Sequence, residues 1–481
     1  MKREHTPLSL PIGTTGHWPI FSWPVRLTGR ELEKHKHILG TTGVGKSKFN
    51  AHIASYLILH NQPCSVIDPH ADLTHDILAI LLDRGFFNHQ EAFKKLWYIE
   101  FARPDRVIPF NVLHQPYSVQ TTVRNLLEAI KRVFPALANG AAPNFENILQ
   151  FTTVALTQNQ LPITLASRFL TQADFREKLL ARVTHEETAA FFHDRFDQWD
   201  TKERTHNIES TLNKISIFTF TDTLRYALGA TKNCLQFRSL MDSGTSILFN
   251  LGNLDTETRH LLGSLIMVGF EQATLSRADT LEEHRNRYHI LVDEFAQFTT
   301  RSEEAFTTFL SEARKFKITL WLSHQTGMQI STRFQSALQN ALPIFFQPGR
   351  EDALWAAQIF GKYDPYKIKH TVEDHSQEAK SHPVFWGVHE QFEDMARELE
   401  ELRVREAYIK MERGLFSRKT KAIKFRTIHL PKPKATWVDL QKLRDTYAQQ
   451  LLVPFSPMTE EDLSPTTSSP TLQRKRSGIE P

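Results

Sequence analysis

The chain has 481 residues, of which 40% are hydrophobic, enough for two or three domains with cores of their own. Its two cysteines, Cys64 and Cys234, lie in no CxxC pair, which argues against a disulfide framework or a zinc cluster and favours a reducing compartment. The start of the sequence has no apolar secretory stretch, and no run of about 20 apolar residues occurs. We therefore expect a cytoplasmic chain without a membrane span of its own.

The net charge of +4 hides an uneven distribution. One stretch, 413–434, carries basic residues and no Asp or Glu. These residues are Arg413, Arg418, Lys419, Lys421, Lys424, Arg426, Lys432 and Lys434. Such an arm suits a phosphate backbone, and it equally suits a solvated connector, so the sequence leaves both interpretations open.

Residues 1–34 are rich in Pro, Gly and Thr and predict an extended lead-in. Short apolar runs that favour strands follow, and helical patterns such as Lys46–Leu59 and Glu303–Phe316 separate several of them. The predicted strands are His37–Leu39, Cys64–Asp68, Leu96–Phe101, Ser246–Leu251, Tyr288–Val292, Ile318–Leu322 and Ile344–Phe346. Apolar strands joined by helices predict an α/β fold with a mostly parallel central sheet, covered on both faces.

The stretch 119–235 interrupts this alternation, because its patterns are helical and it has no strong strand signal. We therefore predict an all-α domain at 119–235, inserted into a discontinuous core formed by 35–118 and 236–395. A charged helix and the basic arm would fill 396–434. The last stretch, 435–481, is predicted to be mostly disordered because its end is dense in Pro, Ser and Thr.

One segment fits the phosphate-binding pattern GxxxxGK[ST] at every fixed position. It is Gly40-Thr41-Thr42-Gly43-Val44-Gly45-Lys46-Ser47, and it lies between a predicted strand and a predicted helix. The glycines let successive N–H groups point at a phosphate, Lys46 would reach the β- and γ-phosphates, and Ser47 would ligate Mg²⁺. A plain glycine turn before a helix is the alternative. The pattern predicts binding of ATP with Mg²⁺.

A second polar site follows the apolar run Tyr288–Val292, which ends in Asp293 and Glu294. In P-loop ATPases, a strand-end aspartate holds the Mg²⁺ and an adjacent glutamate activates the attacking water. Acidic pairs are common on solvated surfaces. Their place after an apolar strand in a chain with a P-loop favours the catalytic interpretation, and we predict ATP hydrolysis.

Further polar candidates follow or precede predicted strands. Gln325 comes just after the run Ile318–Leu322 and is the candidate sensor of the γ-phosphate. Arg314 lies near the end of a helix, where it could reach a neighbouring subunit's ATP as an arginine finger or complement the helix C-terminus. Arg350 is a weaker finger candidate. Asp68 could contact the metal site or cap the next helix, and capping is favoured.

In this order, the motifs resemble those of the HerA–FtsK superfamily of hexameric ATPases, and most of all the conjugative coupling proteins (TraG/TraD-like ATPases of type IV secretion). The resemblance runs from about residue 11 to 389. It rests on His37–Ser47, Val66–Leu73, Met241–Leu251, Leu261–Ser264, Leu291–Phe298, Ser311–Phe316, Ser323–Gln325 and Asp352–Ala353.

This resemblance implies a RecA-like core, a homo-hexameric ring and DNA threaded through its channel without sequence readout. Lys46 and Ser47, Asp293 and Glu294, Gln325 and Arg314 fall on the family's phosphate and metal, water-activating, γ-sensing and finger positions. The inserted domain would recognise the relaxosome, the DNA or another partner, and the partners expected for the whole protein include a relaxase and a secretion channel. The sequence departs from the membrane-bound members in lacking N-terminal spanning helices, so any place at the inner membrane would be peripheral, through a partner.

Two alternatives to a conjugative DNA translocase remain open at this point. One is a HerA-like DNA-processing motor that works with a separate nuclease chain. The other is an ATP-dependent assembly platform for secreted protein cargo, whose ATP turnover would be indifferent to DNA.

Overall fold

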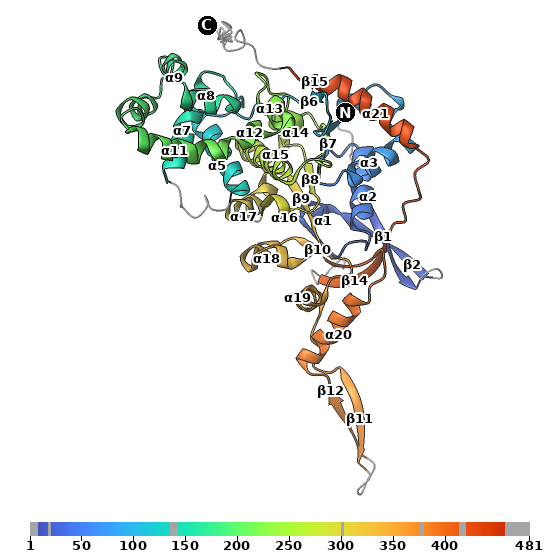
Figure 1. Cartoon of the computed structure of the whole chain (residues 1–481). Helices are drawn as coiled ribbons and strands as arrows, with labels where there is room; N and C mark the ends of the chain where they lie inside the picture. Colours follow the sequence, from blue (N-terminus) through green and yellow to red (C-terminus); the bar gives the residue numbers. More distant parts are fainter. Residues whose placement is uncertain are drawn as a thin grey trace, which may run out of the picture. The chain divides into compact units, whose positions relative to one another are not determined.

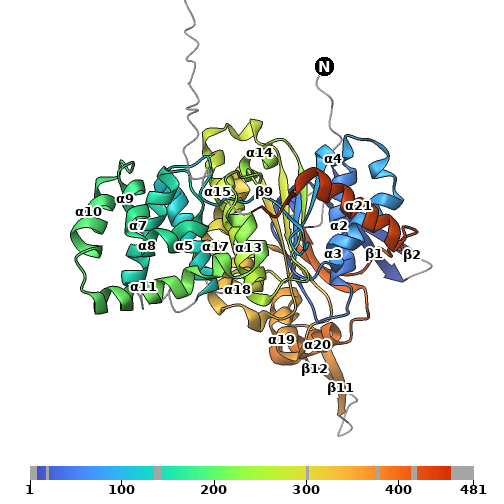
Figure 2. The ribbon, with the colours of Figure 1, turned by 45° about the horizontal axis from the view of Figure 1, so that its top comes forward.

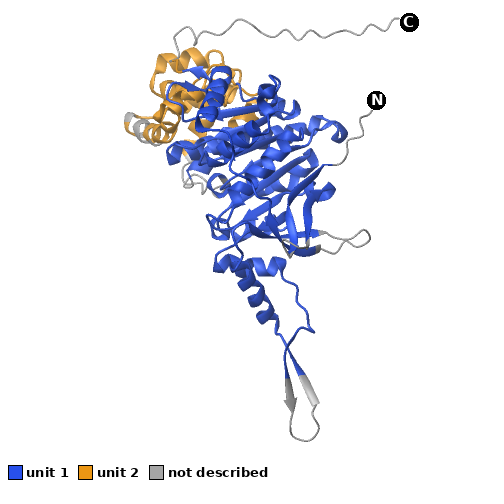
Figure 3. Cartoon of the chain, turned by 90° about the vertical axis from the view of Figure 1, so that its right-hand side faces the viewer, with its two compact units in different colours: residues 1–108, 124–143, 234–454 blue, residues 109–123, 144–233, 455–481 orange. Residues whose placement is uncertain are grey.

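The computed structural model describes residues 8–17, 21–134, 143–299, 303–374, 380–412 and 420–456. The chain divides into two compact units, coloured blue and orange in Figure 3. The first comprises residues 1–108, 124–143 and 234–454, and the second comprises 109–123, 144–233 and 455–481. All the candidate site residues belong to the first unit.

The first unit is built on an 11-stranded sheet with the order β2-β1-β14-β13-β10-β3-β9-β8-β4-β7-β5. Its strands are β1 (Ser9–His17), β2 (Phe21–Thr28), β3 (Lys36–Leu39), β4 (Cys64–Asp68), β5 (Leu96–Glu100), β7 (Ser246–Asn250), β8 (Tyr288–Val292), β9 (Ile318–His324), β10 (Leu342–Phe345), β13 (Glu406–Glu412) and β14 (Thr420–Thr427). The seven strands from β10 to β5 are parallel, and the other four are antiparallel. The predicted α/β fold with a mostly parallel sheet is confirmed.

The parallel strands are continuous apolar runs because both faces of the sheet are covered by helices. Every residue of β3, β4, β7, β8 and β9 is buried. Figure 2 shows α2, α3 and α21 on one side of the sheet and α14, α15, α17 and α18 on the other. These helices are α2 (Lys46–Leu59), α3 (Asp72–Asp83), α21 (Trp437–Leu451), α14 (Phe237–Asp242), α15 (Thr256–Ser276), α17 (Glu303–Glu312) and α18 (Thr332–Leu338).

Two helices and a hairpin follow β10. Helix α19 (Arg350–Phe360) packs on α20 (Val388–Glu400), and between them the chain forms the two-stranded ribbon β11 (Ile368–Asp374) and β12 (Lys380–Phe385), seen at the bottom of Figure 1. Buried alanines of α19 and α20 share a core cluster with Leu39, Phe345 and Tyr408 of the sheet. Shorter elements of this unit are α1 (Gly29–Glu33), η1 (Phe86–Asn88), α4 (Ala92–Lys95), β6 (Arg106–Val107), η4 (Arg277–Asp279), η5 (Glu282–His284), α16 (Ala296–Thr299), η6 (Ala313–Phe316), η7 (Gly327–Gln329) and β15 (Val453–Pro454).

The second unit is helical in its described residues. Its elements are α7 (Pro143–Gln158), η2 (Ile163–Leu165), α8 (Ala166–Thr171), α9 (Ala173–Leu180), α10 (Glu186–Ala190), η3 (Phe191–Phe196), α11 (Thr201–Ile215), α12 (Ile217–Phe220) and α13 (Asp222–Leu228), and α5 (Val119–Val133) begins in it. Stacked and edge-on aromatic rings, among them Phe169, Phe192 and Phe196, fill its core.

The predicted lead-in, charged helix and basic arm need correction, because they contribute β1 and β2, β13, and β14 to the sheet. In β1 and β2, alternate residues such as Leu10, Ile12 and Leu27 are buried, so an apolar face joins the sheet despite the Pro and Gly content. In β14, Ile423 and Phe425 are buried while the lysine and arginine residues between and after them are exposed. This is the period of two that a half-buried strand requires. The arm residues 413–419 lie outside the described residues.

The predicted disordered tail also needs correction in its first part. Helix α21 begins at a capping box in which Thr436 and Asp439 exchange hydrogen bonds. Its residues Leu440, Leu443 and Tyr447 are buried in the main core. The apolar spacing within 436–451 is what forms this helix, whereas the Pro, Ser and Thr content on which the prediction relied lies further along the chain. Residues 457–481 lie outside the described residues. Within the described ranges, no helix combines the length and apolar character needed to cross a bilayer.

Candidate active site

The loop between β3 and α2 has the backbone that its glycines permit. Gly43 and Gly45 have φ of 84° and 105°, a region that L-residues with side chains rarely adopt. A Cβ on Gly40 would lie 2.7 Å from the Cβ of Phe346, so the loop passes too close to the residue after β10 for any larger side chain. The Thr41 N–H donates to the Gln347 carbonyl at 2.9 Å, which ties the loop to the segment after β10.

Lys46 is the first residue of α2, and its amine lies back across this loop. The Nζ donates to the Gly40 carbonyl and, at 3.0 Å, to the Thr41 carbonyl. Burial lowers the pKa of Lys46, and the nearby carboxylates of Glu294 and Asp293 oppose that shift. The amine therefore lies inside the loop and close enough to both carboxylates to interact with them.

Asp293 and Glu294 come directly after β8, at the same sheet edge as the loop, because β3 and β8 run parallel. Asn50 of α2 donates to Asp293 Oδ1 at 3.4 Å, which links the helix after the loop to the acidic pair. Both carboxylates are buried, at 7% and 6% exposed. Glu294 has φ of 46°, a left-handed conformation that a non-glycine residue adopts at a cost of about 1–3 kcal/mol.

Negative charge accumulates at this site. Burial raises the pKa of Asp293 to about 7, and the carboxylates of Asp68 and Glu294 add to the rise. The Ser323 hydroxyl and the Lys46 charge act in the opposite direction. A buried site in which acidic groups outweigh the one adjacent lysine is suited to a further cation.

Asp68, at the end of β4, caps α3, as the sequence favoured. Its carboxylate accepts from the backbone N–H groups of His70, Ala71 and Thr74 at 2.8–3.1 Å and from the Thr74 hydroxyl at 3.0 Å. These hydrogen bonds occupy both oxygens of the Asp68 carboxylate. Asp68 therefore influences Asp293 through its charge.

Gln325 follows β9, the strand between β3 and β8. The Thr42 hydroxyl donates to Gln325 Oε1 at 3.1 Å, so the amide lies against the phosphate loop. Immediately before it, His324 approaches His37 with their Nε2 atoms 2.7 Å apart and both rings buried. Burial lowers the pKa of His324 to about 3 and that of His37 well below its usual value. This neutral pair therefore joins β9 to β3 beneath the loop.

Within one chain, Arg314 does not lie at the phosphate loop. It lies in η6, just before β9, and therefore at the sheet edge opposite to the loop. Its side chain is exposed and lines a separate cavity with His35 and Lys34 at the start of β3. Arg350 is engaged elsewhere, since it pairs with Glu393 at 2.7 Å and Glu400 at 3.0 Å.

Two residues that the sequence analysis missed contribute to the site. Asn50 contacts Asp293, and its Oδ1 is buried without a hydrogen-bond partner among the described residues. It lies one helical turn after Lys46, on a helix that is otherwise largely apolar on that face, and this position was a usable signal. Ser323 lowers the pKa of Asp293 from the neighbouring strand, a role that no spacing in the sequence indicates.

The donor set fits Mg²⁺ held partly by a nucleotide. Among the described residues, no cluster of three His, Cys, Asp or Glu side chains forms a protein cage for a metal. Mg²⁺ at phosphate sites needs only one or two protein oxygens beside phosphates and waters. The exposed Ser47 hydroxyl and the Asp293 carboxylate, with its excess of negative charge, are oxygens of that kind.

Comparisons with known proteins agree with this geometry. The family model described as "Helicase HerA, central domain" matches residues 14–268, more than half of the chain. The sequence has no match among curated proteins. Among solved structures, the unbound bacterial conjugative coupling protein TrwB has a TM-score of 0.58 at 15% identity, over 85% of this chain and 88% of that one.

The same coupling protein in complex with ADP and Mg²⁺ gives a TM-score of 0.54 at 14% identity, over 85% of this chain and 89% of that one. At such identities the likeness establishes the fold. The family follows from the match over residues 14–268, and with it the chain belongs to the HerA central-domain family and is a P-loop ATPase.

Proposed function

We propose that this protein is a motor ATPase that uses ATP and Mg²⁺ to move DNA, as a homo-hexameric ring acting in conjugation or transfer of a mobile element. The observation that carries the proposal is the contact between the two halves of the site. Asn50, four residues after Lys46, touches Asp293, and Thr42 touches Gln325. Segments about 250 residues apart thus meet at one sheet edge.

Each side chain has a chemical role in this proposal. The Lys46 amine exchanges the Gly40 and Thr41 carbonyls for the β- and γ-phosphates, where its positive charge is more strongly attracted. Mg²⁺ bound by Ser47 and Asp293 would neutralise phosphate charge. Glu294 accepts a proton from the attacking water as the water oxygen bonds to the γ-phosphorus and the bond to ADP breaks. Gln325, held against the loop by Thr42, contacts the γ-phosphate.

The match to a helicase family model supports a nucleic acid as the substrate, and the position of Arg314 supports a ring. TrwB is a bacterial conjugative coupling protein, and its structures include complexes with an ATP analogue and with ADP and Mg²⁺. Arg314 lies at the opposite sheet edge from the loop of its own chain and is exposed. This placement suits a finger that completes the ATP site of an adjacent subunit.

A HerA-like motor that processes DNA together with a nuclease chain is a second candidate, favoured by the family match. The two candidates share the ATP site and differ in the partner. Purification of the protein with a nuclease would select the second candidate, and purification with a relaxase would select the first.

The test is the rate of ATP hydrolysis with and without DNA over a salt series. We expect DNA to stimulate turnover and the stimulation to fade as salt rises, because phosphate contacts release counterions. Lys46→Ala should lose turnover and nucleotide binding, by about 10²-fold or more, because the charge that attracts the phosphates is gone. Glu294→Gln should lose turnover to a similar degree while it still binds ATP.

Arg314→Ala should spare nucleotide binding and abolish turnover in the assembled ring, with a loss of about 10³-fold. Lys315→Ala, which changes the adjacent exposed cation, is the matched control and should keep its turnover. Turnover that is unaffected by DNA at every salt concentration would contradict the proposed function.

A further inference from the structure

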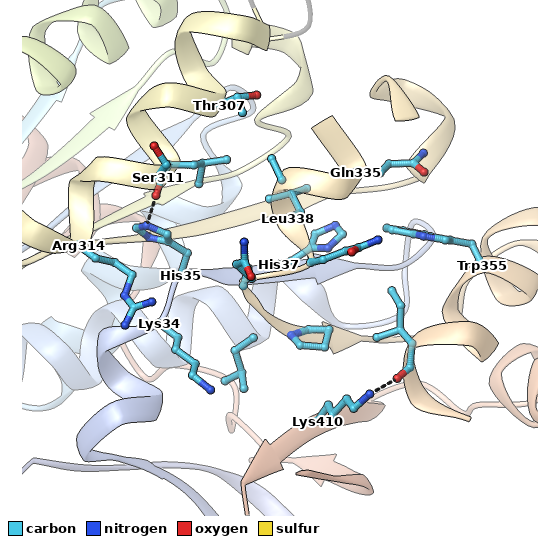
Figure 4. Close-up of a pocket in the computed structure, with 18 of the residues that line it drawn as sticks. Lys34, His35, His37, Thr307, Ser311, Arg314, Gln335, Leu338, Trp355 and Lys410 are labelled. Carbon is cyan, nitrogen blue, oxygen red and sulfur yellow. Dashed lines mark hydrogen bonds between the residues drawn. The ribbon is translucent and has the colours of Figure 1, made fainter. Parts of the chain in front are cut away.

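A cavity of about 980 Å³ lies at the sheet edge opposite to the phosphate loop. Its walls come from the start of β3, from α17 and η6, from α18 and α19, and from β13. In Figure 4, Arg314 and Lys34 lie on one side of it, Lys410 lies below, and Trp355 lies across from Arg314. The volume is in the range of cavities that hold a nucleotide-sized ligand.

Three cationic side chains line the cavity. Its lining includes Lys34, Arg314 and Lys410, and none of its described lining residues is an Asp or Glu. Arg314 makes no ion pair with any residue in the described part of the chain. Lys410 donates to the Ile359 carbonyl at 2.7 Å, a neutral partner that leaves its charge uncompensated. These groups favour an anionic ligand.

The histidines of the cavity do not add to this charge. Burial lowers the pKa of His35 to about 4, and the charges of Lys36 and Arg314 contribute to the shift, against a hydrogen bond to the Leu310 carbonyl. His35 and His37 are therefore neutral near pH 7. The positive charge comes from the lysine and arginine residues, which match the charge of phosphates.

The rest of the lining suits an aromatic base. The half-buried Trp355 contacts the His37 and Phe345 rings, with centroids 5.6 and 5.5 Å away, which fixes its indole at the cavity wall. The lining also includes four amide side chains, those of Gln335, Gln339, Asn340 and Gln358. An indole face stacks on any base, and amides hydrogen-bond to base edges or sugar hydroxyls.

We propose that this cavity is a second nucleotide-binding surface, which takes the phosphates of a nucleoside polyphosphate on Arg314, Lys34 and Lys410 and its base beside Trp355. The nucleotide is either free in solution or held on the phosphate loop of a second copy of this chain. A nucleotide held by a second copy of the chain requires the ring of the proposed function, because that ring places Arg314 and the cavity around it at a subunit boundary.

The first test measures binding of a non-hydrolysable ATP analogue by calorimetry, with the full chain. The variant Lys46→Ala has a disabled phosphate loop, so any nucleotide that it still binds occupies another site. If adding Lys410→Gln to this variant removes that residual binding, the cavity binds free nucleotide. The glutamine keeps a donor for the Ile359 carbonyl and loses the charge, so it separates charge from structure. Lys421→Gln, an exposed lysine on β14, is the matched control, and Lys410→Arg should restore binding.

The second test mixes two chains that are each defective in turnover. Lys46→Ala has an intact cavity, and Lys410→Gln has an intact phosphate loop. Recovery of ATP hydrolysis on mixing shows that the cavity of one copy completes the nucleotide site of another. Because the first test measures binding alone, it stands even if DNA fails to stimulate turnover.

If the cavity takes free nucleotide, we expect Lys410→Gln and Trp355→Ala to weaken nucleotide binding about tenfold or more. If it completes the site of a second copy, the same variants should lower ATP turnover about tenfold or more. In either case Trp355→Phe should keep most of the binding or turnover. The proposal is overturned if Lys410→Gln matches Lys421→Gln in nucleotide binding and in turnover. It is also overturned if Lys410→Gln and Trp355→Ala weaken DNA binding alone, since the cavity would then be a nucleic-acid surface.

Discussion

Asp293 and Glu294 are adjacent residues with different environments. Burial, together with nearby carboxylates, raises the pKa of Asp293 to about 7, whereas Glu294 is held in a left-handed backbone conformation. Both features are unfavourable for the folded chain by itself. Backbone strain and crowded charge of this kind persist where function requires them, and a bound cation relieves the crowding.

The raised pKa of Asp293 makes the stability of the metal-free protein depend on pH. The pKa of Asp293 in the folded protein, about 7, exceeds the ordinary value of 3.8. The contribution of the protonated Asp293 to the free energy of unfolding is therefore fully present below pH 3.8 and is lost as pH rises through 7. Asp293→Asn removes this loss. In chelator, its free energy of unfolding relative to wild type should increase by roughly 2–4 kcal/mol from pH 4 to pH 8.

Denaturant unfolding at several pH values measures this difference. Glu401→Gln, at an exposed carboxylate just after α20, serves as the control and should show a much smaller change. A constant difference between wild type and Asp293→Asn over this range would show that the carboxylate is not destabilised by its surroundings.

At the scale of elements, helix α15 fixes the segment that follows the acidic pair. Gly263 of α15 faces Phe298 of α16, which lies four residues after Glu294 and is 1% exposed. A Cβ on Gly263 would lie 2.3 Å from the Phe298 ring. The glycine therefore allows the close packing that holds the turn at 293–298 in place.

Gly263→Ala tests this packing. Helix propensity alone predicts a gain of about 1 kcal/mol, whereas overpacking predicts a loss of about 1–3 kcal/mol. We expect the clash to dominate, with a lower melting temperature and reduced ATP turnover because residues 293–298 shift. The double variant with Phe298→Leu should recover part of both. An Ala variant that is more stable than wild type and fully active would contradict this account.

Which elements the sequence predicted depends on how their apolar residues are arranged. The bounds of β4 and β8 match the prediction because each is a short buried run with clear limits, which are prolines for β4 and charged residues for β8. Strand β14 was missed because its lysine and arginine residues were counted as an arm, although Ile423 and Phe425 alternate with them. Helix α21 was obscured by the composition of the tail beyond it.

The residues of the site likewise fall into those that the sequence identifies and those that only the fold brings together. Lys46, Asp293 and Glu294 belong to patterns of fixed spacing, so the sequence identifies them as candidates. Their convergence with Asn50 and Ser323 depends on strand order, β3-β9-β8-β4, which no local pattern specifies. The three cations of the cavity come from positions 34, 314 and 410, and only the fold brings them together.

At the scale of the whole molecule, the last described helix belongs to the main core. Tyr447 of α21 is fully buried against Phe93, Tyr98 and Phe87, with ring centroids 5.2–6.3 Å away. The ion pairs of Arg444 with Glu100 and of Arg103 with Asp445 join the helix to the end of β5. The C-terminal segment thus stabilises the sheet that carries the site.

Two variants of one residue test this role. Tyr447→Ala should cost about 3–5 kcal/mol of unfolding free energy, because it leaves a cavity in the core. Tyr447→Phe should cost little or nothing, because the hydroxyl is buried and has no hydrogen-bond partner among the described residues. Chemical denaturation measures both. An Ala variant as stable as wild type would place α21 outside the cooperative core.

The central claim is that the phosphate loop and the acidic pair act on one nucleotide. The most direct measurement is an experimental structure of the protein with a non-hydrolysable ATP analogue and Mg²⁺. We predict that the Lys46 amine leaves the Gly40 and Thr41 carbonyls for the phosphates, with Asp293 beside the metal and Glu294 facing the γ-phosphate. A structure in which the analogue occupies the loop while both carboxylates lie far from the metal would contradict the account.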